Sequence, residues 1–228
     1  MKKLLLVTLS LMLAMQIHAQ YKPVILGLRI GTDLGWMKPN TEDYSSEGVK
    51  LGFTWGFIGE FYFMENYALA TGFNMSFNGG KLEYPYQVTV ADDSINRGVM
   101  HRTYNLRYIQ IPLTLKMKTD LNEKINIFGK IGLGTAFCIN AKANDEINFD
   151  DGTSESKDKR EINDEIALMR ESLIVGGGVE FKIKESTAII VELTYDNDFN
   201  DILTGDNPLT DEPKALHNYV ELGIGIVF

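Results

Sequence analysis

Residues Arg107–Met117 read RYIQIPLTLKM and, from Tyr108 onward, alternate between two kinds of side chain. Isoleucine, leucine and methionine occupy one face, and tyrosine, glutamine, proline, threonine and lysine occupy the other. A period of two residues is typical of a β-strand with one apolar face. A tilted strand needs roughly 9–11 residues to cross a bilayer, so this run is long enough to do so. Pro112 lacks an amide donor, which predicts a local bulge in the strand.

Seven further segments show the same alternation. They are Val24–Met37, Val49–Phe63, Tyr67–Phe77, Ile125–Phe137, Leu173–Ile183, Thr187–Tyr195 and Tyr219–Phe228. Short connections (64–66, 119–124, 184–186) alternate with long polar ones (38–48, 78–106, 139–172, 196–218). Short turns at one end and long loops at the other are the pattern of outer-membrane barrels. We predict an all-β fold, an eight-stranded antiparallel up-and-down transmembrane β-barrel with both termini on the short-turn, periplasmic side.

The first nineteen residues have the features of a signal peptide. Lys2 and Lys3 precede the apolar run Leu4–Met15, and Ala19 is a plausible cleavage point. The run is shorter than the roughly 20 apolar residues that a membrane-spanning helix needs. We therefore expect a cleaved signal peptide over residues 1–19 and an outer-membrane β-barrel domain over residues 20–228.

The composition of the chain excludes one class of partner, nucleic acid, and one means of stabilising the fold, the disulfide bond. Without Lys2 and Lys3 the mature chain carries 20 basic and 31 acidic side chains, a formal charge of −11. A nucleic-acid partner needs a basic surface, so we exclude one. Cys138 is the single cysteine, which excludes a disulfide within the chain.

The alternation fits two barrels, one with an apolar outer wall in a membrane and one soluble with an apolar lumen. The other face is rich in glycine and carries charges of both signs: Arg29, Lys50, Glu60, Lys116, Lys130, Glu180, Glu192 and Glu221. Glycine and pairable charges suit the narrow lumen of an eight-stranded membrane barrel. Aromatic residues near predicted strand ends suit interfacial girdles, as at Trp36, Phe63, Tyr67 and Phe77.

We therefore favour the membrane barrel, with outer-membrane lipid as its surroundings. Leu113, Val191 and Ile224 are predicted to face lipid, and Thr114 and Thr194 to face the lumen. Phe228 ends the last apolar face and resembles the terminal aromatic residue read by the outer-membrane assembly machinery, an expected partner during biogenesis.

Three short motifs resemble the PorT-like outer-membrane β-barrel family, which is common in Bacteroidota. They are GLRIG at Gly27–Gly31, RYIQIPLTLK at Arg107–Lys116 and GKIGLG at Gly129–Gly134. The resemblance implies a barrel in the outer membrane of a Gram-negative bacterium. It also implies possible secretion-complex proteins as partners, since the name-giving members act in protein secretion and gliding.

No catalytic constellation stands out. The mature histidines, His101 and His217, are predicted in extracellular loops, where we interpret them as solvated residues. The lumen carboxylates are expected to form structural ion pairs with lysine and arginine. We predict that the protein is not an enzyme and has no catalytic, cofactor-binding or metal-binding residues.

Two acidic segments raise the question of cation binding. Asp145–Glu165 is interpreted as mobile acidic surface, with Asp150–Arg160 as its tip, although the preceding strand could continue above the membrane to Phe149. Asp196–Asp201 is left open as a candidate cation site. Neither segment has the full spacing of a calcium-binding loop.

The resulting hypothesis is a small non-enzymatic outer-membrane β-barrel protein with a structural or surface-interaction role through long extracellular loops. One alternative is an accessory component of a protein secretion or gliding complex. Another is a soluble periplasmic β-barrel that binds an apolar ligand.

Overall fold

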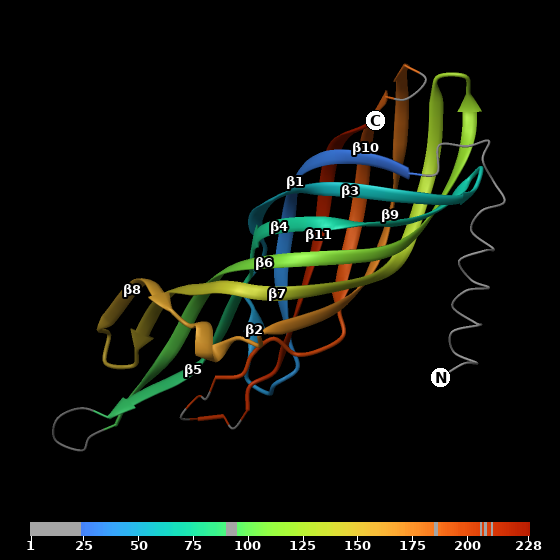
Figure 1. Cartoon of the computed structure of the whole chain (residues 1–228). Helices are drawn as coiled ribbons and strands as arrows, with labels where there is room; N and C mark the ends of the chain where they lie inside the picture. The colour runs from blue at the N-terminus through green and yellow to red at the C-terminus, as the bar shows by residue number, and fades with distance from the viewer. Residues whose placement is uncertain (1–23, 90–94, 185–186, 206, 208, 211) are drawn as a thin grey trace, which may run out of the picture.

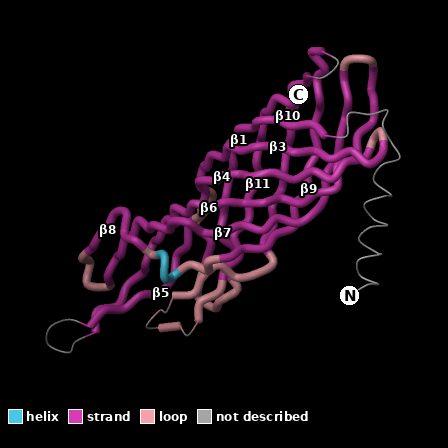
Figure 2. The backbone as a smooth tube through the Cα atoms, viewed as in Figure 1, coloured by secondary structure: helices cyan, strands magenta, loops and turns pink. Residues whose placement is uncertain are grey.

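The computed structural model describes residues 24–89, 95–184, 187–205, 207, 209–210 and 212–228. Within them, one antiparallel sheet closes on itself (Figures 1 and 2). Its strands are β1 (Val24–Pro39), β2 (Ser45–Ser46), β3 (Lys50–Met64), β4 (Tyr67–Asn78), β5 (Lys81–Thr89), β6 (Ile95–Asn122), β7 (Ile125–Phe149), β8 (Ser154–Glu161), β9 (Met169–Lys184), β10 (Thr187–Asp198) and β11 (Ala215–Val227). A 3₁₀ turn, η1, spans Asn163–Glu165. The predicted signal peptide lies outside the described residues.

Eight strands form the barrel, in the order β1-β3-β4-β6-β7-β9-β10-β11. The ring closes where β1 pairs with β11, from Gly27 opposite Val227 to Pro39 opposite Ala215. This confirms the predicted eight-stranded, up-and-down antiparallel barrel. Within the described residues, no helix is long and apolar enough to span a membrane.

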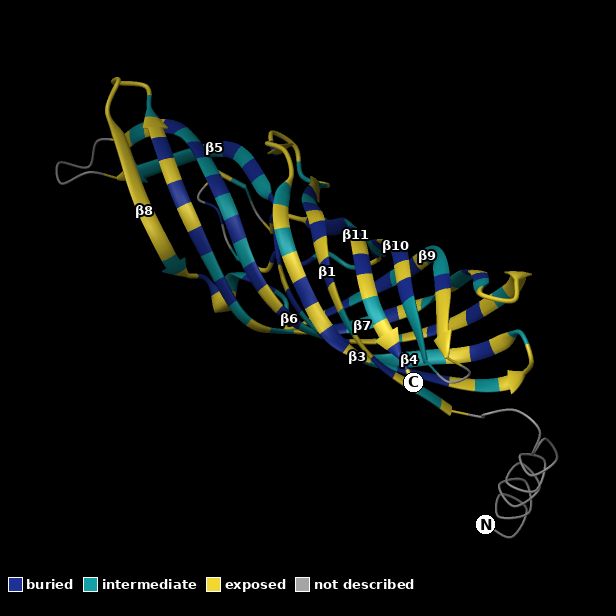
Figure 3. Cartoon of the chain, turned by 90° about the horizontal axis from the view of Figure 1, so that it is seen from above, coloured by how far each residue is buried: buried dark blue, intermediate teal, exposed yellow. Residues whose placement is uncertain are grey.

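The apolar faces of the barrel strands point outward. Leu113 and Ile224 are 52% and 50% exposed, whereas Glu60 and Lys116 on the opposite face are each 3% exposed. Figure 3 shows this alternation of exposed and buried residues along the strands. The lipid-facing prediction is confirmed. The soluble alternative is wrong because the apolar face lies outside the barrel and the charged face lies inside.

Aromatic pairs lie near both ends of the outer wall. Trp36 stacks on Tyr195 near the long-loop end, with ring centroids 6.1 Å apart. Phe63 and Tyr67 flank the β3–β4 turn, with centroids 6.4 Å apart. Both pairs occupy the positions expected of interfacial girdles.

Pro112 keeps its place in β6 without a bulge. It pairs with Gly134 of β7, and the β4–β6 register is the same on either side of it, at Thr71 opposite Leu113 and Asn74 opposite Gln110. The Thr71 hydroxyl donates to the Pro112 carbonyl at 2.7 Å. The predicted bulge is therefore wrong, because the β4–β6 pairing is interrupted at Ile111 and Pro112 and resumes in the same register.

The long-loop end is a folded sheet. β6 and β7 continue past the barrel, β5 pairs with the start of β6, and β8 pairs with the end of β7 (Figure 1). β2 pairs with β5. We call β2, β5, β8 and the neighbouring parts of β6 and β7 the extra-membrane sheet. The prediction that 78–106 is a loop is wrong over most of its length, and the continuation of β7 to Phe149 is confirmed.

The polar segment Asp150–Arg160 also differs from the prediction. Only the turn before Ser154 lies outside a strand, and β8 then pairs with β7. β8 is an edge strand exposed along nearly all of its length, so its sequence lacks the apolar alternation that signals a strand. That is why composition predicted a mobile tip here.

One face of the extra-membrane sheet packs a core of its own. The connections β1–β2, β8–β9 and β10–β11 cover it and contribute Tyr44, Ile162, Ile166, Ile202 and Leu203. The sheet and adjoining barrel ends contribute Met37, Leu82, Tyr84, Met100, Tyr104, Leu106, Tyr108 and Ile147. Burial of these residues holds the sheet above the barrel, since apolar area removed from water contributes about 25 cal/mol per Å².

The opposite end consists of tight turns. β3 and β4 are joined by residues 65–66, and β6 and β7 by residues 123–124. Leu26 and Phe228 exchange backbone hydrogen bonds of 3.1 and 2.8 Å at this end. Both described chain ends therefore lie on the short-turn side, as predicted.

Candidate functional site

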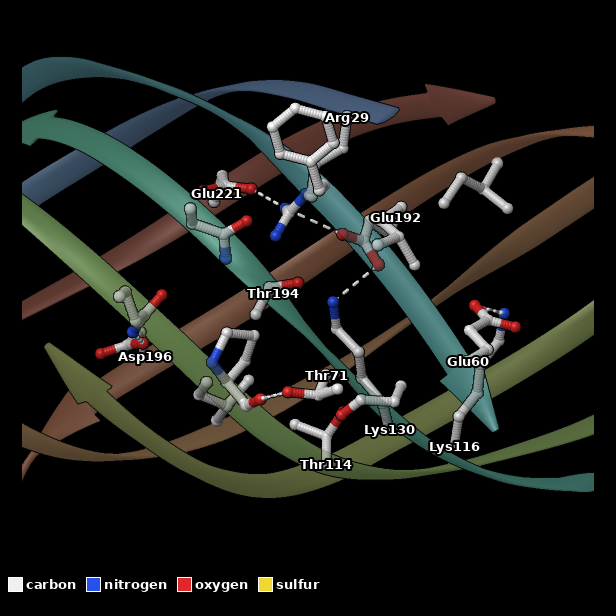
Figure 4. A pocket seen from close by; sticks show the side chains of 18 of the residues that line it. Arg29, Glu60, Thr71, Thr114, Lys116, Lys130, Glu192, Thr194, Asp196 and Glu221 are labelled. Carbon is white, nitrogen blue, oxygen red and sulfur yellow. Dashed lines mark hydrogen bonds and ion pairs between the residues drawn. The ribbon is translucent and has the colours of Figure 1, made fainter. Parts of the chain in front are cut away.

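The middle of the barrel lumen is filled by an ion-pair network. Arg29 Nη2 lies 2.8 Å from Glu192 Oε1 and also bonds Glu221, and Lys130 Nζ lies 2.7 Å from Glu192 Oε2 (Figure 4). These four residues come from β1, β7, β10 and β11. Glycine makes room for them, because a Cβ at Gly223 would lie only 3.1 Å from Arg29 Nη2.

A second network lies toward the short-turn end. Lys116 Nζ is 2.6 Å from Glu60 Oε1 and also bonds Glu180, whose other oxygen accepts from Asn126 at 3.1 Å. The ammonium group sits 4.3 Å above the Phe128 ring. Seven of the eight lumen charges named from the sequence therefore form structural ion pairs, as expected. Lys50, toward the long-loop end, instead donates to a backbone carbonyl at 3.5 Å.

A third network closes the lumen toward the long loops. Arg170 is fully buried, and its Nη1 lies 2.9 Å from Asp198 Oδ1 and 3.3 Å from Asp196 Oδ1. The rings of Tyr108 and Tyr219 lie 5.0 and 5.4 Å from its guanidinium carbon. The first two carboxylates of Asp196–Asp201 therefore face a guanidinium, so the candidate cation site in this segment is wrong.

His217 belongs to the same network. It is fully buried, its Nε2 lies 3.1 Å from the Gly79 carbonyl oxygen, and its backbone amide donates to Asp198 at 3.1 Å. The prediction of a solvated loop histidine is wrong because β11 begins at Ala215 and turns this side chain inward. Between these networks the lumen retains a cavity of about 60 Å³.

A larger cleft of about 280 Å³ lies above the barrel, on the covered face of the extra-membrane sheet. Its lining includes Tyr44, Tyr84, Tyr86, Met100, Arg102, Asp145, Lys157, Arg160, Glu165, Leu203 and Asn207. These residues come from four of the five strands of the extra-membrane sheet, the η1 turn and the β1–β2 and β10–β11 connections. We call this cavity the tyrosine cleft.

Two arginines and two carboxylates fix one side of the tyrosine cleft. Arg102 binds Asp145 through Nε and Nη2, at 2.6 and 2.9 Å, and Glu165 through Nη1 at 2.7 Å. Arg160 reaches the same partners, Asp145 at 3.0 Å and Glu165 at 2.7 Å. Bidentate arginine–carboxylate pairs fix geometry as well as charge. Asp145–Glu165 is therefore held at both ends, contrary to the prediction of a mobile acidic surface.

Tyrosine rings form the other side. Tyr44 and Tyr84 stack with centroids 4.5 Å apart, and Asn207 Nδ2 donates to the Tyr44 hydroxyl at 2.8 Å. Arg102 lies 5.7 and 5.9 Å from the ring centroids of Tyr84 and Tyr104. Burial raises the pKa of Tyr104 to about 12, so its hydroxyl stays neutral at physiological pH. The cleft thus offers aromatic faces beside a fixed cationic group.

The sequence prediction missed this cleft because most of its residues lie in segments assigned to loops. One signal was present: the large side chains Leu82, Tyr84 and Tyr86 occupy every second position, and so do Met100, Arg102 and Tyr104. Two neighbouring runs of this kind indicate a β-hairpin. The structure contains that hairpin as β5 and the start of β6.

His101 lies in β6, on the outer face of the extra-membrane sheet. Its Nδ1 is 2.9 Å from Glu47 Oε1 and 3.9 Å from Glu83 Oε2. The prediction of a solvated loop residue is wrong here as well, since the imidazole is partly covered and contacts carboxylates. The structure thus brings one imidazole and two carboxylates together at this surface.

A closed eight-stranded barrel with an apolar outer wall and a charged, filled lumen defines an outer-membrane β-barrel protein. Residues 18–204 match the family described as outer membrane protein beta-barrel domain, and the chain belongs to that family. Its location is the outer membrane. The family match is general and does not single out the PorT-like group.

Solved outer-membrane barrels are similar to this chain at low identity. Neisserial surface protein A is 11% identical with a TM-score of 0.49, over 89% of this chain and 95% of its own. Ail of Yersinia pestis is 15% identical with a TM-score of 0.40, over 90% and 98%. OprG of Pseudomonas aeruginosa is 11% identical with a TM-score of 0.39, over 89% and 95%. A search of curated proteins finds no match.

Proposed function

We propose that this protein is a non-enzymatic surface-interaction protein that binds a ligand in the tyrosine cleft. One observation carries the proposal: the long-loop end is a sheet with its own core and a cleft of about 280 Å³. Loops that carry recognition in barrels are positioned by the rigid scaffold below them. Here the scaffold itself extends above the membrane. On this proposal the sheet faces the cell exterior, as long loops of outer-membrane barrels do, and lipid covers the apolar wall.

The contents of the lumen support a role outside it. Buried ion pairs fill the barrel at three levels, and the remaining cavity of about 60 Å³ has room for a few water molecules only. Eight-stranded barrels have interiors that side chains can fill. The four lumen glutamates are each bonded to lysine or arginine, which suits a structural role better than acid–base catalysis.

The rigidity of the tyrosine cleft supports ligand binding. Arg102 and Arg160 are already oriented by Asp145 and Glu165, and Tyr44 is held by Tyr84 and Asn207. A binding surface that is ordered before the ligand arrives loses less conformational entropy on binding. Stacked tyrosines beside arginine offer apolar faces and fixed donors to the ligand.

The test is photocrosslinking in living cells. A photoreactive amino acid replaces Tyr86, which lines the tyrosine cleft and is partly exposed. We expect a specific adduct that disappears when Tyr84→Ala is added, because that change removes one wall of the cleft. Absence of an adduct, or an adduct that persists in Tyr84→Ala, contradicts the proposal.

Two control positions separate the alternatives. The same probe at Phe63, on the lipid-facing wall, should give no protein adduct. At Glu123, in the β6–β7 turn, a stoichiometric adduct with other envelope proteins would favour the secretion-complex role that the PorT-like resemblance implies. Adducts at Glu123 without adducts at Tyr86 would replace our proposal with that role.

A further inference from the structure

We propose that Glu47, Glu83 and His101 form a zinc site on the outer face of the extra-membrane sheet. Nδ1 of His101 and one oxygen of each glutamate lie within 4.8 Å of one another. The proposal is independent of the tyrosine cleft, which lies on the other face of the same strands.

The fold fixes all three residues. Glu83 of β5 and His101 of β6 are direct cross-strand partners, so their side chains share one face. Glu47 follows β2, and its amide donates to the Lys81 carbonyl at 3.1 Å. Segments distant in the sequence thus converge through backbone pairing. Any ion held here ties the β2–β3 connection to β5 and β6.

The separations suit zinc. Zinc bonds to histidine nitrogen and carboxylate oxygen at about 2.0–2.2 Å in a tetrahedron, which places neighbouring ligand atoms about 3.3 Å apart. The distances from Nδ1 to the two glutamate oxygens, 2.9 and 3.9 Å, bracket that value. Small side-chain rotations would equalise them, and water can take the fourth position. A mixed imidazole and carboxylate set suits zinc better than magnesium, which favours oxygen alone.

The charge of the surroundings favours a cation. Within the described residues, neither Glu47 nor Glu83 forms an ion pair with lysine or arginine, unlike the lumen glutamates. Glu146 of β7 stands opposite His101 on its other side, and Asp158 lines the same hollow of about 320 Å³. Lys81 is the one lysine or arginine among the described residues lining that hollow. The imidazole and carboxylates are partly exposed, so an ion can enter from solvent.

The test is zinc titration of the full chain, purified in detergent without a histidine tag and stripped with EDTA. Calorimetry should show one zinc ion per chain and no comparable binding of magnesium. His101→Gln and Glu83→Gln should each weaken zinc binding at least about tenfold, the lower end of the loss seen even when residues behind a ligand are changed. Glu123→Gln, an exposed glutamate in the β6–β7 turn, is the matched control and should bind as the wild type does.

A second readout reports the imidazole directly. Diethyl pyrocarbonate should modify His101, which is partly exposed, and spare His217, which is fully buried. Zinc should protect His101 from modification. Heat-modifiable migration on gels confirms that each variant is folded. The proposal is overturned if the wild type binds no stoichiometric zinc, if His101→Gln binds zinc as tightly as the wild type, or if zinc leaves His101 reactive.

Discussion

Lys116 illustrates how single residues hold the lumen together. It is 3% exposed and lies between two carboxylates from different strands, Glu60 of β3 and Glu180 of β9. Taking such charges out of water is costly, so each group depends on its partners. Lys116→Met should leave two buried carboxylates facing each other and lower the free energy of unfolding by about 3–5 kcal/mol. Urea titration of the protein in lipid vesicles measures this.

The matched control is the triple variant Lys116→Met, Glu60→Gln and Glu180→Gln. Removing the uncompensated charges should recover much of the lost unfolding free energy, so the effects of the three substitutions should not add. Equal destabilisation in the single and triple variants would show that Lys116 acts through packing alone.

Leu113 tests the outer wall at the same scale. It lies in the middle of the membrane-crossing part of β6 and is 52% exposed. Leu113→Arg should cost about 2–4 kcal/mol if the site lies at the bilayer midplane. Leu121→Arg, one residue before the end of the same strand, should cost about 0–1 kcal/mol because it lies near the interface. The same unfolding titration compares them, and equal costs at both positions would place Leu113 outside the apolar layer.

The sequence predicted whether Leu113 and Lys116 point to lipid or to the lumen, because side chains in a strand alternate between its two faces. The partners of Arg170 and His217 could not, since both residues lay in segments assigned to loops. The structure shows that β9 begins at Met169, so Arg170 belongs to the strand and points into the lumen. The sequence pattern placed the start of this strand after Arg170.

At the scale of elements, the β6–β7 hairpin accounts for both the barrel wall and the sheet above it. Its strands span 28 and 25 residues, more than twice the roughly 9–11 that the bilayer requires. The period of two residues predicted the membrane-crossing halves of these strands, where most residues alternate between apolar and polar or small. In the upper halves, one face packs against the covering connections and the other faces water instead of lipid, so the outer face carries polar residues. The sequence pattern therefore did not reveal these upper halves or β5, which pairs with one of them.

Arg102 connects these elements and allows a test at this scale. Arg102→Leu leaves Asp145 with Arg160 alone and removes the cation that bridges β6, β7 and η1. Breaking a buried pair costs roughly 3–5 kcal/mol, and here the loss falls on the extra-membrane sheet. We expect proteinase K added to intact cells to cut this sheet faster while the barrel stays heat-modifiable.

Lys157→Gln is the control for that experiment, because Lys157 pairs with Glu155 at the exposed surface of β8, where ion pairs contribute little. Its digestion should match the wild type. Loss of the barrel itself in Arg102→Leu would mean that the sheet and barrel fold as one cooperative unit.

At the scale of the whole molecule, the two ends of the barrel differ in how much structure they carry. One end consists of two-residue turns and the described chain ends, and the other carries a folded sheet with its own core (Figure 1). The sequence predicted this asymmetry from connection lengths alone. It did not predict that the long end is ordered, because the core there joins residues far apart along the chain, such as Tyr44, Met100 and Ile202.

The asymmetry predicts an orientation that labelling can test. Cys138 is the single native cysteine, so Cys138→Ser gives a background without thiols. Lys157→Cys in β8 should react with a membrane-impermeant maleimide added to intact cells, since the extra-membrane sheet is expected outside. Glu123→Cys in the β6–β7 turn should react only after the outer membrane is permeabilised. Both positions are exposed, so a difference in labelling reports sidedness and not burial. Labelling of Glu123→Cys alone in intact cells would invert the barrel, place the tyrosine cleft in the periplasm and rule out a surface-exposed ligand.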